Sequence, residues 1–460
     1  MFSSDAPYQK HIHFVGVGGT GLSAIAQVLL ERGYRVSGSD RQASPATDHL
    51  AAQGAQVYIG HAVEHIQGVD LVVISSAVPV DNPEVTAARA QGLPVLKRNE
   101  FIGQMLEGQQ TIAVAGTHGK TTTTAMIAFI LSEAGLDPGF IIGGLSGNLG
   151  TNARHGRGPH FVIEADEYDF MFLGLTPHLA IVTNVEMDHP DCFGCIEDVV
   201  QAFRAFLSRV PPDGCIIANG DERRVKSMLE QMSLPRIQTY GLAPGLNWQA
   251  REMQAIGEGE QCFVAWREEA LLGPFTLQIP GVHNVLNALA AIAATSELGV
   301  SLSTIQDSLL RFEGTARRFE RKGTAGGVVV IDDYAHHPTE IRATLAAARA
   351  RYAGRSLWTV FQPHTYSRFK FMLKDFAQSF DLVDHVIVTD IFAARESDTL
   401  GAHPTDLIKI MQHPDARYIS GFENVVDYLA GHVRPGDVCL TLGAGDGYLI
   451  GEELLRRLAA

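Results

Sequence analysis

Cysteine is scarce in this sequence. The 460 residues include five cysteines, Cys192, Cys195, Cys215, Cys262 and Cys439. An odd number without the spacing of a disulfide framework favours free thiols in a reducing compartment. The single Cys192-x-x-Cys195 pair also lacks the second pair of ligands that a zinc site needs. The sequence therefore predicts a cytoplasmic protein without structural disulfides.

Long apolar runs and an excess of basic residues are missing as well. No run approaches the roughly 18 apolar residues of a membrane-spanning helix, and residues 1–10 are polar and lead directly into a strand pattern. Acidic residues outnumber basic ones by 51 to 36, and the formal net charge of -15 disfavours binding to nucleic acids or anionic membranes. We therefore expect no nucleic-acid and no membrane partner. A monomer and a homodimer both stay open.

What the chain does have is a repeated alternation of strand and helix patterns, which predicts an α/β fold. At roughly 150 residues per domain, the chain should form about three domains, each with its own core. The patterns place the first domain at residues 1–108, the second at 109–313 and the third at 314–460.

The first domain opens with a strand pattern at His11 to Val15, followed by Gly16-Val17-Gly18-Gly19-Thr20-Gly21 and a helical pattern to Arg32. A second strand, Tyr34 to Ser37, ends near Asp40. Gly-x-Gly-x-x-Gly with an acid about 20 residues further on is typical of dinucleotide binding, because the glycines admit a diphosphate onto a helix N-terminus and the acid can hold a ribose hydroxyl. Taken alone, the motif suggests NAD or FAD. Glycines that serve only close helix packing are the simpler alternative.

The second domain opens with the apolar run Thr111-Ile112-Ala113-Val114, the turn Ala115-Gly116-Thr117-His118-Gly119-Lys120-Thr121 and a helical pattern from Thr122 to about Glu133. Glycines let backbone N–H groups close on a phosphate, Lys120 can reach the β- and γ-phosphates, and the Thr121 hydroxyl can bind Mg²⁺. The predicted ligand is ATP. A surface turn with a chance Gly-Lys-Thr is the simpler alternative.

Two later strands of this domain end in residues of the kind that bind metals. Phe161 to Ile163 continues into Glu164-Ala165-Asp166-Glu167-Tyr168-Asp169, and Leu179 to Asn184 continues to His189. Because the carboxyl ends of parallel strands meet at one sheet edge, the ends of both strands should lie beside the phosphate-binding turn at 115–121, the P-loop. Glu164, His189 and the Thr121 hydroxyl would then form a Mg²⁺ site.

Other parts of the second domain are less informative. Asp166 and Asp169, taken individually, fit a solvated acidic loop. Residues 236–278 predict short strands that form an antiparallel addition. The stretch Pro280 to Asn287 opens a helix to about Glu297 and carries Asn284 and Asn287 on one face of its first turn, where their amides could bind a base or ribose. An N-cap and an exposed polar residue would be equally ordinary there.

The third domain repeats the alternation of strand and helix. The strand at Gly327 to Ile331 ends in Asp332-Asp333-Tyr334-Ala335-His336-His337-Pro338, and the strand at Ser356 to Phe361 is followed by His364 and Arg368. Further strands are predicted at 385–389 and 438–442. Three histidines and an arginine just beyond strand ends favour a site over histidines that only satisfy the core.

In this order and spacing, the motifs resemble those of the Mur ligases, the ATP-dependent amino-acid-adding enzymes of peptidoglycan synthesis, over essentially the whole chain. Six motifs carry the resemblance: Gly16-Val17-Gly18-Gly19-Thr20-Gly21, Gly116-Thr117-His118-Gly119-Lys120-Thr121-Thr122, Glu164-Ala165-Asp166-Glu167, Asn184-Val185-Glu186-Met187-Asp188-His189, His283-Asn284-Val285-Leu286-Asn287 and Asp332-Asp333-Tyr334-Ala335-His336-His337-Pro338.

The resemblance implies a Rossmann-like N-terminal domain, a central P-loop ATPase domain with an antiparallel addition, and a C-terminal Rossmann-like domain. It also implies that the first domain binds the uridine diphosphate of a nucleotide sugar and not NAD. The residues implied for the nucleotide sugar are Gly18, Gly19, Ser39, Asp40, Ser75 and His118. Those implied for ATP are Gly116, Thr117, His118, Gly119, Lys120, Thr121, Thr122, Asn284, Asn287, Arg317 and Asp332.

Magnesium is the implied cofactor, bound by Thr121, Glu164 and His189. The implied catalytic residues are Lys120, His189, His336 and Arg368, of which the last two lie near the incoming amino acid.

The alanine-adding branch of the family is the most similar. It implies that L-alanine is joined to the lactyl carboxylate of UDP-N-acetylmuramate through an acyl phosphate, with release of ADP and phosphate. A recycling branch adds a tripeptide to the same nucleotide sugar and shares most motifs, but Gly18-Gly19 and Glu340 look more like the alanine-adding branch. An NAD-dependent oxidoreductase would explain the first glycine motif but neither the P-loop nor the clustered acids.

The sequence departs from the wider pattern at three places. A general P-loop has glycine where this chain has Val114, so the turn is a shortened form. Several relatives carry a carbamylated lysine in the helix that here reads Gln201 to Leu207 without lysine, so a second Mg²⁺ must be held otherwise. Some alanine-adding relatives carry arginine where this chain has Thr365, which leaves the contact to the amino-acid carboxylate to Arg368.

Overall fold

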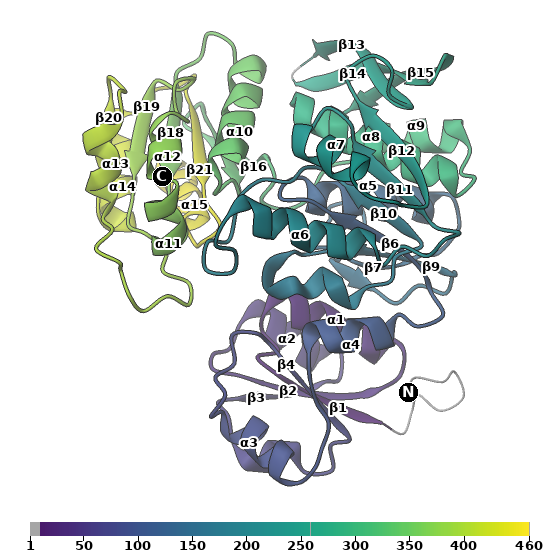
Figure 1. Cartoon of the computed structure of the whole chain (residues 1–460). Helices are drawn as coiled ribbons and strands as arrows, with labels where there is room; N and C mark the ends of the chain where they lie inside the picture. Colours follow the sequence, from purple (N-terminus) through teal and green to yellow (C-terminus); the bar gives the residue numbers. More distant parts are fainter. Residues whose placement is uncertain (1–9, 258, 460) are drawn as a thin grey trace. The chain divides into compact units, whose positions relative to one another are not determined.

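The computed structural model describes residues 10–257 and 259–459 (Figure 1). The polar start of the chain therefore lies outside the described residues, apart from Lys10. The described chain forms two compact units. The first contains the residues up to Val185 together with Glu197–Gln249 and Ala288–Ser308, and the second contains Glu186–Ile196, Ala250–Asn287 and the residues from Leu309 onward.

The first sheet is parallel throughout, with the strand order β3-β2-β1-β4-β5. Its strands alternate with helices, which places α1 and α2 on one face and α3 on the other (Figure 1). The order reverses between β1 and β4, the point at which such sheets bind their ligands. The elements are β1 (His11–Val15), α1 (Thr20–Glu31), β2 (Arg35–Asp40), α2 (Pro45–Ala52), β3 (Gln56–Ile59), the 3-10 helix η2 (Val63–Ile66), β4 (Leu71–Ile74), α3 (Pro83–Ala90), β5 (Val95–Lys97) and α4 (Arg98–Met105).

The second sheet has the parallel order β12-β11-β10-β6-β9-β7, with β8 antiparallel at the edge. The P-loop strand β6 lies between β9 and β10, so the carboxyl ends of all three share one edge and the predicted juxtaposition is confirmed. The elements are β6 (Gln110–Ala115), α5 (Lys120–Glu133), β7 (Gly139–Ile141), β8 (Ala153–Arg154), β9 (His160–Glu164), the 3-10 helix η3 (Tyr168–Gly174), β10 (Leu179–Val182), α6 (Ile196–Leu207), β11 (Cys215–Asn219), α7 (Arg223–Glu230) and β12 (Arg236–Gly241).

The predicted antiparallel addition at residues 236–278 is only partly correct. β12 pairs in parallel with β11, so it extends the main sheet. β13 (Trp248–Ile256) begins with a parallel pairing to β12, and the antiparallel pair is formed by β14 (Glu260–Arg267) and β15 (Ala270–Leu277). The sequence did not predict β13. Its first three residues are buried, but the remaining ones do not alternate between apolar and polar side chains as a half-buried strand would. The predicted helix that follows is α8 (Val282–Glu297), and α9 (Leu302–Leu310) comes after it.

The third sheet has the order β16-β17-β21-β18-β19-β20, antiparallel only at β16. Alternate residues of β17 pack into two cores: Val329 and Ile331 join α10 to α13, and Val328 and Val330 join α14 and α15. The short edge strands β16 and β20 were not predicted. The elements are β16 (Glu320–Ala325), β17 (Val328–Asp333), α10 (Pro338–Arg351), β18 (Leu357–Phe361), α11 (Tyr366–Phe371), α12 (Leu373–Ala377), β19 (His385–Val388), α13 (Pro404–Ile410), β20 (Ala416–Tyr418), α14 (Phe422–His432), β21 (Val438–Leu442) and α15 (Tyr448–Ala459).

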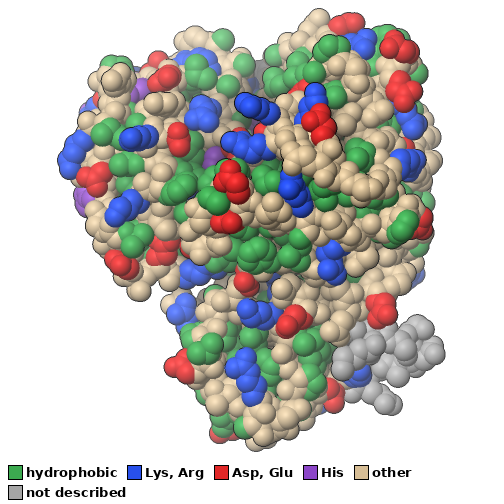
Figure 2. Space-filling view, in the orientation of Figure 1, with side chains coloured by type: hydrophobic (Ala, Val, Ile, Leu, Met, Phe, Trp, Pro, Cys, Tyr) green, Lys and Arg blue, Asp and Glu red, His purple; other side chains and the backbone are tan. Residues whose placement is uncertain are grey.

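The surface carries both signs of charge. On the face shown in Figure 2, acidic and basic side chains are interspersed with uncharged ones. Within the described part of the chain, no helix is long and apolar enough to cross a membrane. The thiols of Cys215 and Cys439 are buried, and burial raises the pKa of both, that of Cys439 to about 12. These two cysteines therefore serve as core residues.

Candidate active site

The glycine turn after β1 is held by the end of β2. The N–H of Gly16 donates to the Ser39 carbonyl at 2.8 Å, and the N–H of Gly18 donates to the Asp40 carboxylate at 2.8 Å. A Cβ on Gly18 would lie 2.9 Å from the same Asp40 oxygen. Gly19 caps α1 without a side-chain hydrogen bond, and the first turn of α1 has no acidic residue. Such a helix N-terminus favours an anion.

Ser39, near the end of β2, holds this turn through its backbone carbonyl. Its side chain is fully buried, and its hydroxyl donates to Glu84 at 2.5 Å. The Glu84 carboxylate also lies 2.6 Å from Nδ1 of His65 and 3.0 Å from Nδ1 of His61. Burial raises the pKa of Glu84, but the neighbouring His13 and the hydrogen bonds from Ser39 and His65 outweigh it and lower this pKa to about 2. The Ser39 hydroxyl is therefore engaged inside the domain, and its contact to a nucleotide sugar stays a prediction.

Ser75 lies on the other side of the turn. It follows β4, and a Cβ on Gly16, whose φ is +84°, would lie 3.1 Å from the Ser75 Cβ. The predicted nucleotide-sugar residues Gly18, Asp40 and Ser75 thus gather around the point where the strand order reverses.

The P-loop turn is held by the end of β10. The N–H of His118 donates to the Asn184 side-chain oxygen at 2.8 Å, and its carbonyl accepts from the Thr183 hydroxyl at 2.6 Å and the Asn184 amide at 3.1 Å. Gly116 has a φ of +137°, and a Cβ there would lie 1.8 Å from the Thr183 hydroxyl oxygen. Gly119 caps α5 in the left-handed region, with a φ of +82°. Both glycines are therefore required by the backbone.

Lys120 is bound inside the turn that it follows. Its Nζ donates to the carbonyls of Gly116 at 2.6 Å and Thr117 at 3.2 Å, and to the Glu167 carboxylate at 2.7 Å. Burial opposes the charge on Lys120, but Glu167 and the neighbouring carboxylates of Asp166 and Glu164 raise its pKa above the ordinary value. The ammonium is therefore charged and points toward the acids at the end of β9.

The residues at this edge fit a hard divalent cation. Thr121 and Thr122 lie in the first turn of α5 and are buried, and Glu164 ends β9, where it accepts the N–H of Gly143 at 2.7 Å. The Thr121 hydroxyl and the carboxylates of Glu164 and Asp166 supply oxygen donors only, and Mg²⁺ prefers oxygen ligands. The third predicted ligand, His189, belongs to the second compact unit.

In the second unit, Arg368 is paired with Asp188. Its Nε donates to Asp188 at 2.7 Å and its Nη1 to the His364 carbonyl at 2.7 Å, while Nη2 lies 3.5 Å from Nδ1 of His189. Both charged side chains are nearly buried, at 5% and 7% exposed. Burial opposes ionisation of Asp188, but Arg368, His189 and His336 hold its pKa well below the usual range. The pair is a fixed ionic element beside three histidines.

His336 and His364 lie edge to face, with ring centroids 5.8 Å apart. Nδ1 of His336 lies 2.9 Å from the Tyr334 carbonyl and 3.3 Å from the Glu340 carboxylate. Burial lowers the pKa of His336 to about 4, and burial together with the neighbouring His336 and Arg368 lowers that of His364 to about 2. Both imidazoles are neutral near pH 7, so they are suited to hydrogen bonding rather than to carrying charge.

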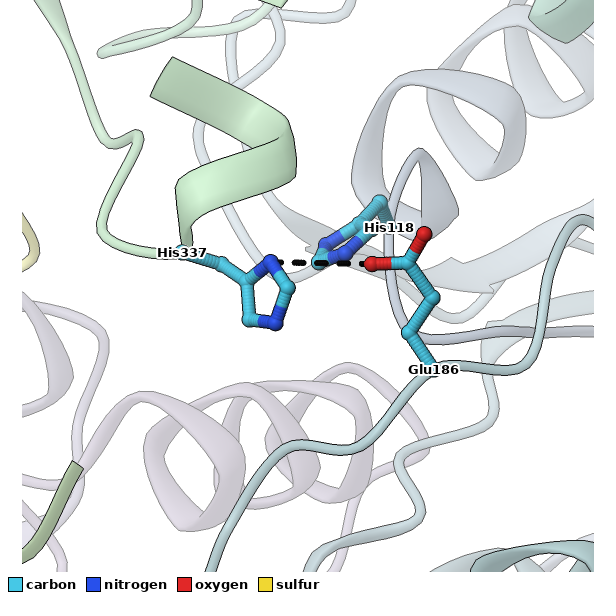
Figure 3. Close-up of side chains that lie close together, drawn as sticks. All are labelled: His118, Glu186 and His337. Atoms are coloured by element: carbon cyan, nitrogen blue, oxygen red, sulfur yellow. Dashed lines mark ion pairs between the residues drawn. The ribbon is translucent and has the colours of Figure 1, made fainter. Parts of the chain in front are cut away.

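His337, the third histidine of the predicted site, has a structural role. Its Nδ1 accepts the N–H of Thr339 at 3.2 Å and so caps α10, and its Nε2 lies 3.1 Å from the Met187 carbonyl. Figure 3 shows that His337 lies beside Glu186, with Nδ1 of the imidazole 3.7 Å from the carboxylate. The Thr339 hydroxyl donates to the same Glu186 at 2.7 Å.

Arg317 and Asp332 meet at the carboxyl ends of β17 and β21. Nε of Arg317 donates to Asp332 at 2.9 Å, and its two Nη atoms donate to the carbonyls of Gly443 and Gly445 at 2.7 and 2.8 Å. Asp332 is buried inside β17, and this burial raises its pKa although Arg317 opposes the shift. Arg317 and Asp332 are therefore joined by an ion pair. Their predicted contact to ATP stays a prediction.

Asn284 and Asn287 lie side by side in α8. The Asn287 amide donates to the Asn284 side-chain oxygen at 3.2 Å, and the Asn284 amide donates to the Pro280 carbonyl at 2.7 Å. Both are buried, and α8 begins at Val282. The interpretation of an N-cap and an exposed polar residue is therefore wrong.

Three domain profiles of one family match the chain: "Mur ligase family, catalytic domain" at residues 11–110, "Mur ligase middle domain" at 114–295 and "Mur ligase, glutamate ligase domain" at 317–445. The chain belongs to the Mur ligase family. The three-domain α/β architecture that the resemblance implied is thereby confirmed, while the boundaries at 108 and 313 stay predictions.

Individual Mur ligases match over nearly their whole length. The UDP-N-acetylmuramate–L-alanine ligase of Alkaliphilus metalliredigens is 46% identical, with 99% of each chain covered, and that of Geobacter sp. strain M21 is 45% identical, with 98% covered. Among solved structures, the UDP-N-acetylmuramate-alanine ligase of Thermotoga maritima has a TM-score of 0.82 at 29% identity, covering 97% of this chain and 98% of that one. A murein peptide ligase from Psychrobacter arcticus has a TM-score of 0.75 at 28% identity, covering 98% of this chain and 99% of that one.

Sequence reasoning missed several charged partners in this Mur ligase. Asp166 is partly exposed, and its carboxylate also pairs with the Arg98 guanidinium at 3.2 Å. Glu167 and Asp188 bind Lys120 and Arg368. All three acids stand in the quoted motifs, but a run of acids is typical of an exposed loop, so its pattern did not single them out.

Two of the three departures noted in the sequence have a defined local structure, at Val114 and at Thr365. Val114 is fully buried within β6, so this position belongs to the strand and not to the turn. Thr365 caps α11, and its hydroxyl donates to Glu396 at 2.8 Å.

Proposed function

We propose that this chain joins L-alanine to the lactyl carboxylate of UDP-N-acetylmuramate, with ATP as co-substrate, in peptidoglycan precursor synthesis. One observation carries the proposal: the chain is 44–46% identical, over 97–99% of its length, to three UDP-N-acetylmuramate–L-alanine ligases. The P-loop, with Lys120 charged and aimed at the acids of β9, supplies the machinery that the ATP step needs.

The reaction needs activation because a carboxylate is a poor electrophile. The lactyl carboxylate would attack the γ-phosphate of ATP, giving an acyl phosphate and ADP. The alanine amine would then form the C–N bond as the bond to phosphate breaks, and it would lose its protons to solvent or a nearby base. Lys120 would exchange Glu167 for phosphate oxygens and neutralise the charge that develops on the transferring group.

Alanine would be held by residues of the second unit. The Arg368 guanidinium, kept charged by Asp188, would bind the alanine carboxylate. His336 is neutral, with its pKa lowered to about 4 by burial, so it is a weak base and would orient the amine by a hydrogen bond. Asn284 and Asn287 would bind the adenosine of ATP. Arg317 and Asp332, which belong to the third domain, would bind the same nucleotide.

Mg²⁺ is the proposed cofactor, and when bound it would neutralise phosphate charge. Thr121 and Glu164 would hold it, with His189 as the third proposed ligand. Cytoplasmic location and a monomeric or homodimeric state are further proposals, and sedimentation of the purified protein would measure the latter.

The test is phosphate release from purified protein with ATP, Mg²⁺ and UDP-N-acetylmuramate, with L-alanine, glycine, L-serine and tripeptide offered in turn. We expect release that depends on the nucleotide sugar and is fastest with L-alanine. Faster release with the tripeptide would favour the recycling ligase instead. A change in nicotinamide absorbance without phosphate release would favour an oxidoreductase.

A further inference from the structure

Arg98 lies between the two glycine turns of the first unit. It is the first residue of α4, directly after β5, and its guanidinium packs against the first turn of α1. A Cβ on Gly21 would lie 2.4 Å from its Nη1 and 3.4 Å from its Cζ, so glycine at 21 leaves the room that the guanidinium fills. The cation thus lies against the helix that follows the diphosphate turn.

On its other side, Arg98 reaches the acids of the ATP site. Its Nη2 donates to the Asp166 carboxylate at 3.2 Å, and the two side chains are 24% and 32% exposed. Asp166 in turn raises the pKa of Lys120 through its charge. Asp166 therefore pairs with Arg98 and also favours the charged form of Lys120.

The diphosphate turn needs a cation from elsewhere. The segment Gly16 to Gly21 contains no lysine or arginine, and backbone N–H groups alone do not neutralise a diphosphate. A guanidinium binds phosphate through two parallel hydrogen bonds. A partly exposed ion pair contributes little to stability, so Arg98 can leave Asp166 at small cost.

We propose that Arg98 binds the diphosphate of the nucleotide sugar and exchanges Asp166 for it. The inference rests on the proposed function, because it takes the nucleotide sugar as the ligand of the first domain. It adds a binding residue to those that the sequence predicted.

Two variants separate this role from a purely structural one. Arg98→Ala and Asp166→Asn both remove the ion pair, but only the first removes the anion contact. Calorimetric titration without ATP would measure the dissociation constants of UDP-N-acetylmuramate and of UDP. We expect Arg98→Ala to raise both by about 10- to 100-fold, as for a lost hydrogen bond to a charged group, and Asp166→Asn to leave both within twofold or lower them.

Controls keep the result interpretable. Arg89→Ala removes an exposed arginine of α3 and should bind the nucleotide sugar as wild type does. Arg98→Lys keeps the charge but cannot make two parallel hydrogen bonds to phosphate, so its dissociation constant should lie between those of the wild type and Arg98→Ala. The unfolding midpoint of each variant checks the fold, and Arg98→Lys decides the question should Arg98→Ala fail to fold.

Three outcomes would overturn the inference: unchanged binding in Arg98→Ala, equal weakening by Arg98→Ala and Asp166→Asn, or weaker binding of UDP-N-acetylmuramate with unchanged binding of UDP, which places the contact at the sugar. Failure of the proposed function is distinguishable, since it would appear as wild-type protein that releases no phosphate with L-alanine.

Discussion

Two glycine turns in the first unit follow central parallel strands and precede helices, yet they handle charge differently. After β1 the turn has no cation of its own, and Asp40 binds the N–H of Gly18. After β6 the turn runs into Lys120, which Glu167 neutralises. Glycine lets a backbone approach phosphate in both cases. The placement of the fixed charge is what distinguishes the turn proposed to bind a diphosphate from the turn proposed for phosphoryl transfer.

The largest effect is expected at the cation of the second turn. Lys120→Ala should lower the rate of alanine-dependent phosphate release by about 10²- to 10³-fold or more, because a preorganised charge on the transferring phosphoryl is lost. UDP binding at the first turn should not change. Initial rates and UDP titration measure the two effects, and Lys374→Ala, at an exposed lysine of α12, is the matched control. A near wild-type rate in Lys120→Ala would contradict the proposed role of Lys120 in phosphoryl transfer.

The two turns should also differ in their tolerance of a side chain. Gly116→Ala should destabilise the protein by about 2–3 kcal/mol, because φ is +137° and the new Cβ would lie 1.8 Å from the Thr183 hydroxyl oxygen. Gly18→Ala should destabilise it by less than about 1 kcal/mol, because the Asp40 carboxylate that the Cβ meets can rotate away. Urea unfolding of both variants measures the difference, and the reverse ranking would contradict it.

A smaller effect is expected at Glu84, which binds the Ser39 hydroxyl beside the first turn. Glu84→Gln should cost about 1–2 kcal/mol near neutral pH, because the charged hydrogen bonds to His65 and Ser39 weaken. The folded-state pKa of Glu84 lies at about 2, below its ordinary 4.5, so its stabilisation is complete above pH 4.5 and is lost as pH falls toward 2. The difference between variant and wild type should therefore shrink over that window.

Urea unfolding at several pH values measures this dependence. Glu64→Gln, at an exposed glutamate of the neighbouring η2, should show no such change. A difference for Glu84→Gln that stays constant from pH 7 to pH 3 would show that the ionised carboxylate is not the stabilising form.

Much of the fold follows from local patterns. Buried strands such as β1, β6 and β18 are mostly apolar, and the glycines and helices after β1 and β6 have signals within a few residues. The direction of β12 had no such signal, because a strand of mixed polarity pairs in either sense and the neighbour decides.

By itself, the sequence determined the two glycine turns that we propose bind phosphate, the shared edge of β6, β9 and β10, and the family. It did so because strand, turn and helix signals depend on neighbouring residues. Only the tertiary structure decided the charge pairs. Arg98 and Asp166 are 68 residues apart, and Arg368 and Asp188 are 180 apart. A short-range Coulomb contact of this kind leaves no periodicity in the chain, since it exists only when the fold brings the two charges together.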